Sequence, residues 1–237
     1  MNANVSDYLR RDFLGHVDML ELLEMGSSSV IYGGEDGVIL YNDMMFSLAC
    51  APGAERDCLR RLLAALPETG GCYVVLHDPE LKTLLLRERG FSTFMDCYQC
   101  LYERAEPVSY SLPAGASIRP LDQGHAGFVH AHYQTVDDEG YIRERIEAGM
   151  FGVFFGETPA GFIGTHDERS IGLLKILPDY RRRGLAFALE AHMINHSLRI
   201  GRRAFGQVSV DNAPSLALQK KLGMTISKSV ITWVERP

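Results

Sequence analysis

No stretch of this sequence approaches the roughly 18 consecutive apolar residues that a helix needs to cross a bilayer. Residues 1–12 are polar and mixed in charge, unlike a secretory signal. Basic residues are not in excess either, because 24 Lys and Arg stand against 30 Asp and Glu, a net charge of −6. An acidic balance argues against wholesale nucleic-acid binding. We therefore expect a soluble, cytoplasmic protein whose partners include neither membranes nor nucleic acids.

The sequence also lacks a cysteine arrangement suited to a metal. Its five cysteines contain one close pair, Cys97 and Cys100, and no second pair that would complete a zinc site. Both lie in an expected strand over residues 94–102, where side chains three residues apart point to opposite faces. We predict no metal cofactor and thiols that stay reduced.

Positive charge is present, but it is concentrated in one part of the chain. The basic residues of this cluster are Arg181, Arg182, Arg183, Arg199, Arg202, Arg203, Lys220 and Lys221. A basic cluster in an acidic protein suggests a small anionic ligand. A solvated helix face is the alternative at this point.

A linker separates two stretches that each look complete. Residues 105–116 carry two prolines, a glycine and two serines, which is typical of a boundary. We expect domains over 1–104 and 117–237, each a mixed α/β fold with a mostly antiparallel sheet flanked by helices. In both, an amphipathic helix ends at a glycine, Gly90 or Gly223, and an apolar residue then enters a strand. This similarity suggests an internal duplication.

Hydrophobic periodicity and turn residues predict the individual elements. In the first domain we expect a helix over 17–25, strands over 30–33, 38–41, 44–50 and 72–76, a helix over 55–66, a helix capped by Asp78 with Pro79 at its first position, and a strand over 94–102. In the second we expect strands over 117–120, 150–155, 161–166, 170–177, 205–210 and 225–234, and helices over 121–133, 141–148, 180–199 and 213–222.

The turn after the strand 170–177 carries the strongest chemical signal. The backbone N–H groups at a helix start are unpaired, and the helix dipole adds positive charge there, so such a turn suits a pyrophosphate. Gly184 and Ala186 leave room for a phosphate near the backbone, and the preceding arginines can add charge-assisted hydrogen bonds. An ordinary strand-to-helix turn with small residues for packing is the alternative.

Two motifs carry a resemblance to a known family. Residues 176–186, ILPDYRRRGLA, resemble the acetyl-coenzyme A signature of the GNAT acyltransferase superfamily: Arg or Gln, two residues, Gly, one residue, then Gly or Ala. Residues 208–224, VSVDNAPSLALQKKLGM, are similar to the family's second cofactor motif, with Asn212 and Ser215 in register. The resemblance extends from residue 117 to residue 237.

The segments 141–146 and 156–161 look closest to the glycine N-acyltransferase-like branch of the superfamily. The first half resembles a degenerate copy of the same fold. Its residues 51–55, APGAE, stand where the phosphate turn belongs but lack the arginines and the glycine spacing. We expect no cofactor there.

The resemblance implies acetyl-CoA, or another acyl-CoA, as co-substrate. The residues that would bind it are Leu174, Ile176, Arg181, Arg182, Arg183, Gly184, Leu185, Ala186, Asn212 and Ser215. The pantetheine arm would pair with the backbone of the strand like an added strand, and a backbone N–H on that strand would stabilise the oxyanion.

The implied activity is N-acyl transfer, in the simplest case N-acetyl transfer, to a primary amine of a small molecule or amino acid. A neutral amine must attack the thioester, so a general base is expected. Glu168 is the first candidate and His166 the second, and a polar hairpin turn over 167–170 is the alternative. Gln219 stands where many members have a tyrosine acid, and an amide cannot supply a proton.

Two other functions remain open from the sequence. A duplicated fold with one degenerate half and no tyrosine acid could bind acyl-CoA as a sensor or scaffold. A nucleotide-binding protein could use the same turn for ATP, although no Lys-Ser or Lys-Thr pair follows Gly184. Neither the acceptor nor the acyl chain is identified, and a homodimer is compatible with the sequence.

Overall fold

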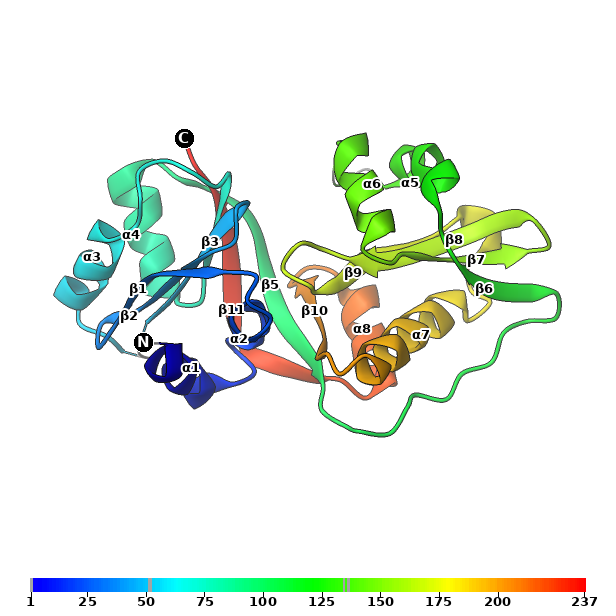
Figure 1. Cartoon of the computed structure of the whole chain (residues 1–237), viewed down its shortest axis with the longest axis horizontal. Helices are drawn as coiled ribbons and strands as arrows, with labels where there is room; N and C mark the ends of the chain where they lie inside the picture. The colour runs from blue at the N-terminus through cyan, green and yellow to red at the C-terminus, as the bar shows by residue number, and fades with distance from the viewer. Residues whose placement is uncertain (1, 51–52, 134, 136) are drawn as a thin grey trace. The chain divides into compact units, whose positions relative to one another are not determined.

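The computed structural model describes residues 2–50, 53–133, 135 and 137–237. The chain forms two compact units, which we describe separately (Figure 1). The first comprises Met1–Leu101, Gln207–Gln219 and Thr225–Pro237, and the second Tyr102–Gly206 and Lys220–Met224.

The expected division at residues 105–116 does not coincide with these units. The last strand, β11 (Thr225–Glu235), packs in the first unit, because it pairs antiparallel with both β4 and β5. The range 117–237 is therefore not one compact body.

The first unit contains a sheet with the strand order β1-β2-β3-β4-β11-β5. Its other elements in chain order are α1 (Asn2–Leu9), α2 (Val17–Glu24), β1 (Ser29–Gly34), β2 (Gly37–Tyr41), β3 (Met45–Cys50), α3 (Arg56–Ala64), β4 (Tyr73–Leu76), α4 (Pro79–Arg89) and β5 (Ser92–Tyr102). The sequence did not predict α1, and the remaining elements match the expected ones to within a few residues.

Helices cover both faces of this sheet. Along β2, Ile39 packs in the core under α3 and α4, whereas its neighbours Val38 and Leu40 pack with α1 and α2. Side chains alternate between the faces of a strand, so strands that are buried along almost their whole length, such as β2 and β3, need cover on both sides. The cap of α4 is as predicted, since Asp78 accepts a hydrogen bond from the Glu80 amide at 2.7 Å and Pro79 follows it.

The second unit is a sheet in which β6, β7, β8, β9 and the beginning of β10 lie in that order. The sheet is antiparallel except between β9 and β10, which pair in parallel at Ile171 and Gly206. In chain order its elements are β6 (Ala116–Pro120), α5 (Ala126–His132), α6 (Glu139–Glu147), β7 (Phe151–Phe155), β8 (Thr158–Thr165), β9 (Ile171–Ile176), α7 (Leu185–Arg199) and β10 (Ala204–Ser209). The helix α8 (Ala213–Leu222) begins in the first unit and ends in the second. The predicted mixed α/β fold is confirmed.

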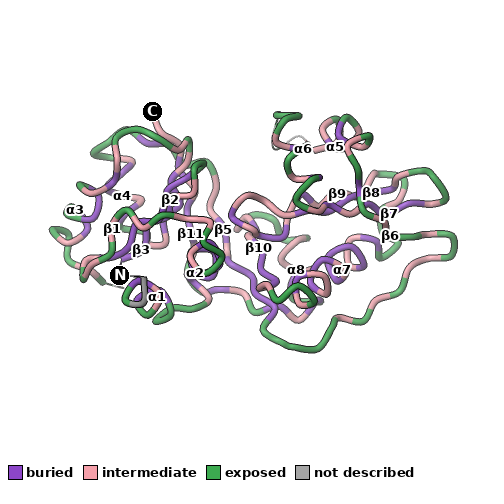
Figure 2. The backbone as a smooth tube through the Cα atoms, in the orientation of Figure 1, coloured by how far each residue is buried: buried purple, intermediate pink, exposed green. Residues whose placement is uncertain are grey.

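Helices α5 and α6 lie on one face of the second sheet and α7 lies on the other (Figure 1). The central strands and the inward helix faces are largely buried, whereas the edge strands β1 and β6 and the linker before β6 are exposed or half-buried (Figure 2). Ile142 and Ile146 of α6 pack on Phe162 of β8 and Leu173 of β9. This packing joins α6 to the strand that carries the candidate site.

Two expected helix starts were wrong. The helix expected from residue 180 begins at Leu185, because Arg182 and Gly184 have φ values of 62° and 78°, which no α-helix tolerates. Residues 178–180 form a separate 3₁₀ turn. The helix expected from residue 121 begins at Ala126, after a 3₁₀ turn over 123–125.

Candidate functional site

Strand β9 carries a bulge at its centre. The register of β8 against β9 shifts between Phe162 and Gly164, so Leu173 and Leu174 both lie opposite Ile163. Leu173 has a φ of 51°, a region that a bulky residue rarely occupies, and it is buried. A bulge leaves the extra residue outside the ladder of backbone hydrogen bonds. The strand can therefore offer backbone groups to a ligand at this point.

The turn after β9 ends in a helix start without a side-chain cap. Gly184 occupies the N-cap position of α7 in a left-handed conformation, and no acidic residue lies in the first turn of the helix. A Cβ built on Gly184 would meet no atom within 4 Å, so the space in front of this glycine is open. The first N–H groups of a helix have no intrahelical partner. This arrangement suits an anion.

The three predicted arginines of the turn are exposed. Arg181 donates from Nε to the Ile176 carbonyl at 3.2 Å, and Arg183 donates from Nη2 to the Asp179 carbonyl at 2.9 Å. In the part of the chain that the structure describes, no salt bridge involves Arg181, Arg182 or Arg183. Among the described residues, no carboxylate thus forms an ion pair with these arginines.

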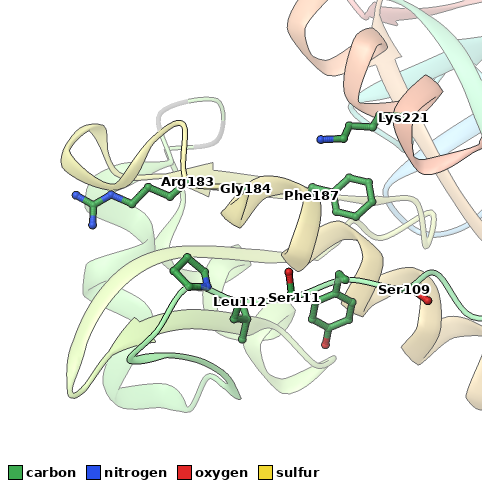
Figure 3. Close-up of a pocket in the computed structure, with 9 residues that line it drawn as sticks. Ser109, Ser111, Leu112, Arg183, Gly184, Phe187 and Lys221 are labelled. Carbon is green, nitrogen blue, oxygen red and sulfur yellow. The ribbon is translucent and has the colours of Figure 1, made fainter.

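A groove of about 470 Å³ opens beside this turn (Figure 3). Arg183 and Gly184 of the turn, Phe187 of α7 and Lys221 of α8 line it, and the linker segment 109–113 lines it from the other side. The lining contains two cations and no carboxylate, and the Lys221 ammonium lies 5.1 Å from the Phe187 ring centroid. Sequence reasoning noticed Lys221 only as part of a basic cluster and did not expect the linker to form a wall.

The linker is fixed to the outer side of α7. The Asn195 side chain donates to the Val108 carbonyl at 2.9 Å and accepts from the Val108 amide at 2.7 Å. The Tyr110 hydroxyl lies 2.9 Å from Nδ1 of the half-buried His192. These bonds hold the residues that line the groove.

The two predicted base candidates lie in the turn between β8 and β9. Glu168 is only 4% exposed, and its Oε1 accepts a hydrogen bond from the Ser170 hydroxyl at 2.5 Å. Burial raises the pKa of Glu168 above its ordinary value, although the nearby His166 opposes the shift. Residues 167–170 do form a hairpin turn, the alternative from the sequence, but the Glu168 carboxylate within it is buried, and its role as a base stays a prediction.

His166 lies close to the same group of residues. Its Nδ1 is 2.8 Å from the Tyr141 hydroxyl of α6. Asp167 forms a salt bridge with Arg145 at 2.7 Å. The structure thus brings His166, Glu168 and Tyr141 together, a set that unites α6 with the β8–β9 turn.

Asn212 and Ser215, two of the predicted cofactor-binding residues, belong to the first unit. The Asn212 side chain accepts from the Ser215 amide at 3.1 Å, and its carbonyl accepts from the Leu216 amide at 3.0 Å. Asn212 is therefore the N-cap of α8. A role of either residue in cofactor binding stays a prediction.

The sequence also predicted that the protein has no metal cofactor and no membrane-spanning helix. Among the residues that the structure describes, no group of three His, Cys, Asp or Glu side chains could hold a metal, and no helix is long and apolar enough to span a membrane. Of the degenerate turn over 51–55, residues Ala51 and Pro52 lie outside the described residues, so the absence of a cofactor there stays a prediction.

Comparison with known proteins shows which family and which solved structures the chain is similar to. Residues 117–224 match the model of the Acetyltransferase (GNAT) family, whereas no curated protein matches the chain. A solved Drosophila protein is 17% identical with a TM-score of 0.75, and the match covers 100% of this chain and 95% of that one. A GCN5-related N-acetyltransferase from Kribbella flavida is 14% identical with a TM-score of 0.61, covering 94% and 95%.

A tandem GNAT protein from the clavulanic acid biosynthesis pathway is 14% identical with a TM-score of 0.50, covering 98% of this chain and 94% of that one. At such identities the solved structures show a shared fold alone. Residues 117–224 are thus similar to a GNAT acetyltransferase domain, and the overall fold matches that of GNAT structures.

Proposed function

We propose that this chain is an N-acyltransferase that moves an acyl group, in the simplest case acetyl, from acyl-CoA to a primary amine by direct attack. The observation that carries the proposal is the bulged strand β9 leading into the uncapped helix start at Gly184, inside the stretch that matches the GNAT family. The acceptor in this proposal is a small-molecule amine or amino acid.

The proposed contacts with the cofactor run along strand β9 and continue into the turn that follows it. The pantetheine arm pairs with the backbone of Leu174 and Ile176, whose half-buried side chains leave the strand accessible. The diphosphate accepts hydrogen bonds from the amides of residues 184–186, and the exposed arginines add positive charge. The groove lined by Phe187 and Lys221 provides further space for an anionic ligand.

In the proposed reaction Glu168 accepts the proton of the amine, and the backbone stabilises the oxyanion. The amine nitrogen attacks the thioester carbon and its proton passes to Glu168, directly or through a water. A raised pKa makes a carboxylate a stronger base, so burial of Glu168 serves this role. The carbonyl oxygen gains negative charge, and a backbone N–H at the Leu173 bulge stabilises it. When the C–S bond breaks, the sulfur leaves as a thiolate, which takes a proton from solvent.

We further assign the chain to the glycine N-acyltransferase-like branch, on the residues 141–146 and 156–161. Tyr141 of the first segment lies beside the base candidates, which supports a functional role for that segment.

A second candidate function is a non-catalytic acyl-CoA sensor or scaffold. The observation that favours it is Gln219, an amide that stands where many family members have the tyrosine acid, and which is buried. A sensor would bind acyl-CoA without releasing a thiol in the presence of any acceptor.

One experiment separates the two functions. The purified protein is incubated with acetyl-CoA and a panel of primary amines and amino acids, and the release of free thiol is followed. Native mass spectrometry of the protein as purified identifies any bound acyl-CoA. Thiol release that depends on an amine supports acyl transfer. Tight binding without release supports the sensor, and absence of binding contradicts both.

A further inference from the structure

We propose that His166 is a hydrogen-bond donor to the reacting acyl oxygen, and that Tyr141 is the positioning residue that keeps it in the donating tautomer. The inference rests on the proposed acyl transfer. It assigns a second donor to the oxyanion, in addition to the amide at the bulge.

The Tyr141 and His166 side chains are in direct contact. The Tyr141 hydroxyl lies 2.8 Å from Nδ1 of His166, and the rings stack with an interplanar angle of 26°. Tyr141 is on α6, which is anchored to the sheet by Ile142 and Ile146, whereas His166 follows β8. A hydrogen bond and ring packing from a separate element fix the orientation of the imidazole.

The protonation of the Tyr141 hydroxyl bears on the direction of this hydrogen bond. Burial, together with the negative charges of Glu168 and Asp167, raises the pKa of the Tyr141 hydroxyl above its ordinary value, and Arg145 only partly opposes this. The phenol is therefore neutral. Nδ1 of His166 is the hydrogen-bond partner of this half-buried hydroxyl, and in the proposed arrangement the phenol donates and Nδ1 accepts. A neutral imidazole that accepts at Nδ1 carries its own hydrogen at Nε2.

Nε2 of His166 lies close to Gly172 of β9. A Cβ on Gly172 would lie 2.5 Å from both Nε2 and Cδ2 of His166, so only a glycine lets the ring approach the strand this closely. Gly172 immediately precedes the bulge at Leu173 and Leu174. The Nε2–H group thus lies beside the backbone that is proposed to face the thioester carbonyl.

His166 and Glu168 differ in whether they can take a proton from the amine. The lone pair of the imidazole is engaged at Nδ1 by Tyr141, so Nε2 has no lone pair with which to take a proton from the amine. The Glu168 carboxylate does have lone pairs that can take this proton, and one of its two oxygens accepts a hydrogen bond from Ser170. In this arrangement His166 donates a hydrogen bond and transfers no proton, while the proton of the amine goes to Glu168.

Several charged and titratable groups of the described residues face the His166–Tyr141 pair. Glu168 and Asp167 come from the β8–β9 turn, Arg145 comes from α6, and Tyr133 follows α5 with its ring centroid 6.5 Å from that of His166. Burial and the charge of Glu168 raise the pKa of Tyr133 as well. Both tyrosines therefore stay neutral, and Glu168 is the group whose titration sets the rise of activity with pH.

Two substitutions of His166 separate donation from base catalysis. Glutamine places an amide N–H near the position of Nε2 but is not a base, whereas alanine removes both. We expect His166→Ala to lower kcat about 100-fold, the loss typical of one oxyanion donor, and His166→Gln to retain most of the activity with an unchanged pH profile. Equal losses in both variants, with the rise of activity with pH abolished, would show that His166 is the base and overturn the proposal.

The positioning role of Tyr141 is tested by Tyr141→Phe, which removes the hydroxyl and keeps the ring. We expect kcat to fall about tenfold, as for the loss of one hydrogen bond, with KM for acyl-CoA unchanged. The matched controls are Tyr41→Phe, whose hydroxyl bonds to the Asp43 carbonyl, and His125→Gln, whose ring bonds to Asp122; both should leave kcat unchanged.

A spectroscopic readout does not depend on turnover. Long-range ¹H–¹⁵N correlation spectra of the intact protein report which ring nitrogen carries the hydrogen, and His166→Gln identifies the resonance. We expect the Nε2–H tautomer, and its loss or mixing in Tyr141→Phe. An Nδ1–H tautomer in the unaltered protein would contradict this inference and leave acyl transfer intact. Absence of acyl-CoA binding and thiol release in the unaltered protein would contradict the proposed function itself.

Discussion

His77 donates a hydrogen bond from Nε2 to the Asp18 carboxylate at 3.0 Å, and both side chains are 1% exposed. The other ring nitrogen, Nδ1, lies 3.0 Å from the Leu48 carbonyl oxygen. Both partners can only accept, so the ring carries a hydrogen on each nitrogen and is positively charged. Gln207 donates to the same carboxylate at 3.4 Å and accepts from the Trp233 indole at 2.7 Å. The charged pair thus joins α2 to the residue that follows β4, and Gln207 and Trp233 connect it to β10 and β11 in the first unit.

The pair predicts a stability that depends on pH. Burial alone would lower the pKa of His77, but the charge and hydrogen bond of Asp18 raise it above 6.5. Burial alone would raise the pKa of Asp18, but His77 lowers it below 3.8. The stabilisation from His77 is fully present below pH 6.5 and is lost as the pH rises through its raised pKa. That from Asp18 is present above pH 3.8 and is lost as the pH falls through its lowered pKa.

We therefore expect Asp18→Asn to lower the free energy of unfolding by about 3–5 kcal/mol near pH 5, because it leaves a buried imidazolium without its counter-charge. The loss should shrink in alkaline buffer, where the histidine can be neutral. Urea denaturation at several pH values measures it. A loss that is the same at all pH values would mean that the pair is not charged.

The open space at Gly184 predicts a selective defect in cofactor binding. Gly184→Glu should abolish CoA binding, because it places a carboxylate where the diphosphate is proposed to lie. The φ of 78° also adds strain of about 1–2 kcal/mol for any larger residue. Gly201→Glu is the matched control, since Gly201 has a φ of 70°, equally open surroundings and a place at the other end of α7. Calorimetry that finds normal affinity in folded Gly184→Glu would contradict the assignment.

The buried carboxylate of Glu168 predicts the shape of the pH–rate profile. A base works only when deprotonated, so activity should rise with pH through the raised pKa of Glu168. Glu168→Gln should lower kcat at neutral pH, on the order of 10²-fold, with partial recovery at high pH where the amine itself is deprotonated. Glu157→Gln, in the exposed β7–β8 turn, should match the unaltered protein. An unchanged profile in Glu168→Gln would exclude it as the base.

Asn212 has two candidate roles that one pair of variants can separate. As the N-cap of α8 it should contribute about 1 kcal/mol, so Asn212→Ala should lower the free energy of unfolding by that amount. Asn212→Asp keeps the cap but adds a negative charge. If Asn212 also contacts the cofactor, Asn212→Asp should preserve stability and weaken CoA binding. Normal CoA affinity in this variant would restrict Asn212 to the cap.

The sequence predicted best where the determinant is local. The start of α4 is set by Asp78 and Pro79, which are adjacent, and the left-handed Gly223 ends α8 as expected. The start of α7 was misplaced because Arg182 adopts a positive φ, a conformation that its side chain does not reveal. The place of β11 between β4 and β5 depends on pairings with residues far away in the chain.

In the candidate site too, the sequence predicted local features but not contacts between distant residues. Gly184 and its arginines form one contiguous motif and were identified directly from the sequence. The bulge at Leu173 could not be, because it arises from the register against β8. Nor could the contact of Tyr141 with His166, which joins residues 25 positions apart on different elements. His166 was named only as an alternative base because sequence does not reveal which ring nitrogen has a partner.

A crystal structure of the protein with acetyl-CoA would test the central claim most directly. We predict that the diphosphate oxygens lie about 2.7–3.2 Å from the backbone nitrogens at the start of α7, with the thioester carbonyl facing the bulge of β9. Coenzyme A bound elsewhere on the chain, or a diphosphate held without those amides, would contradict the account.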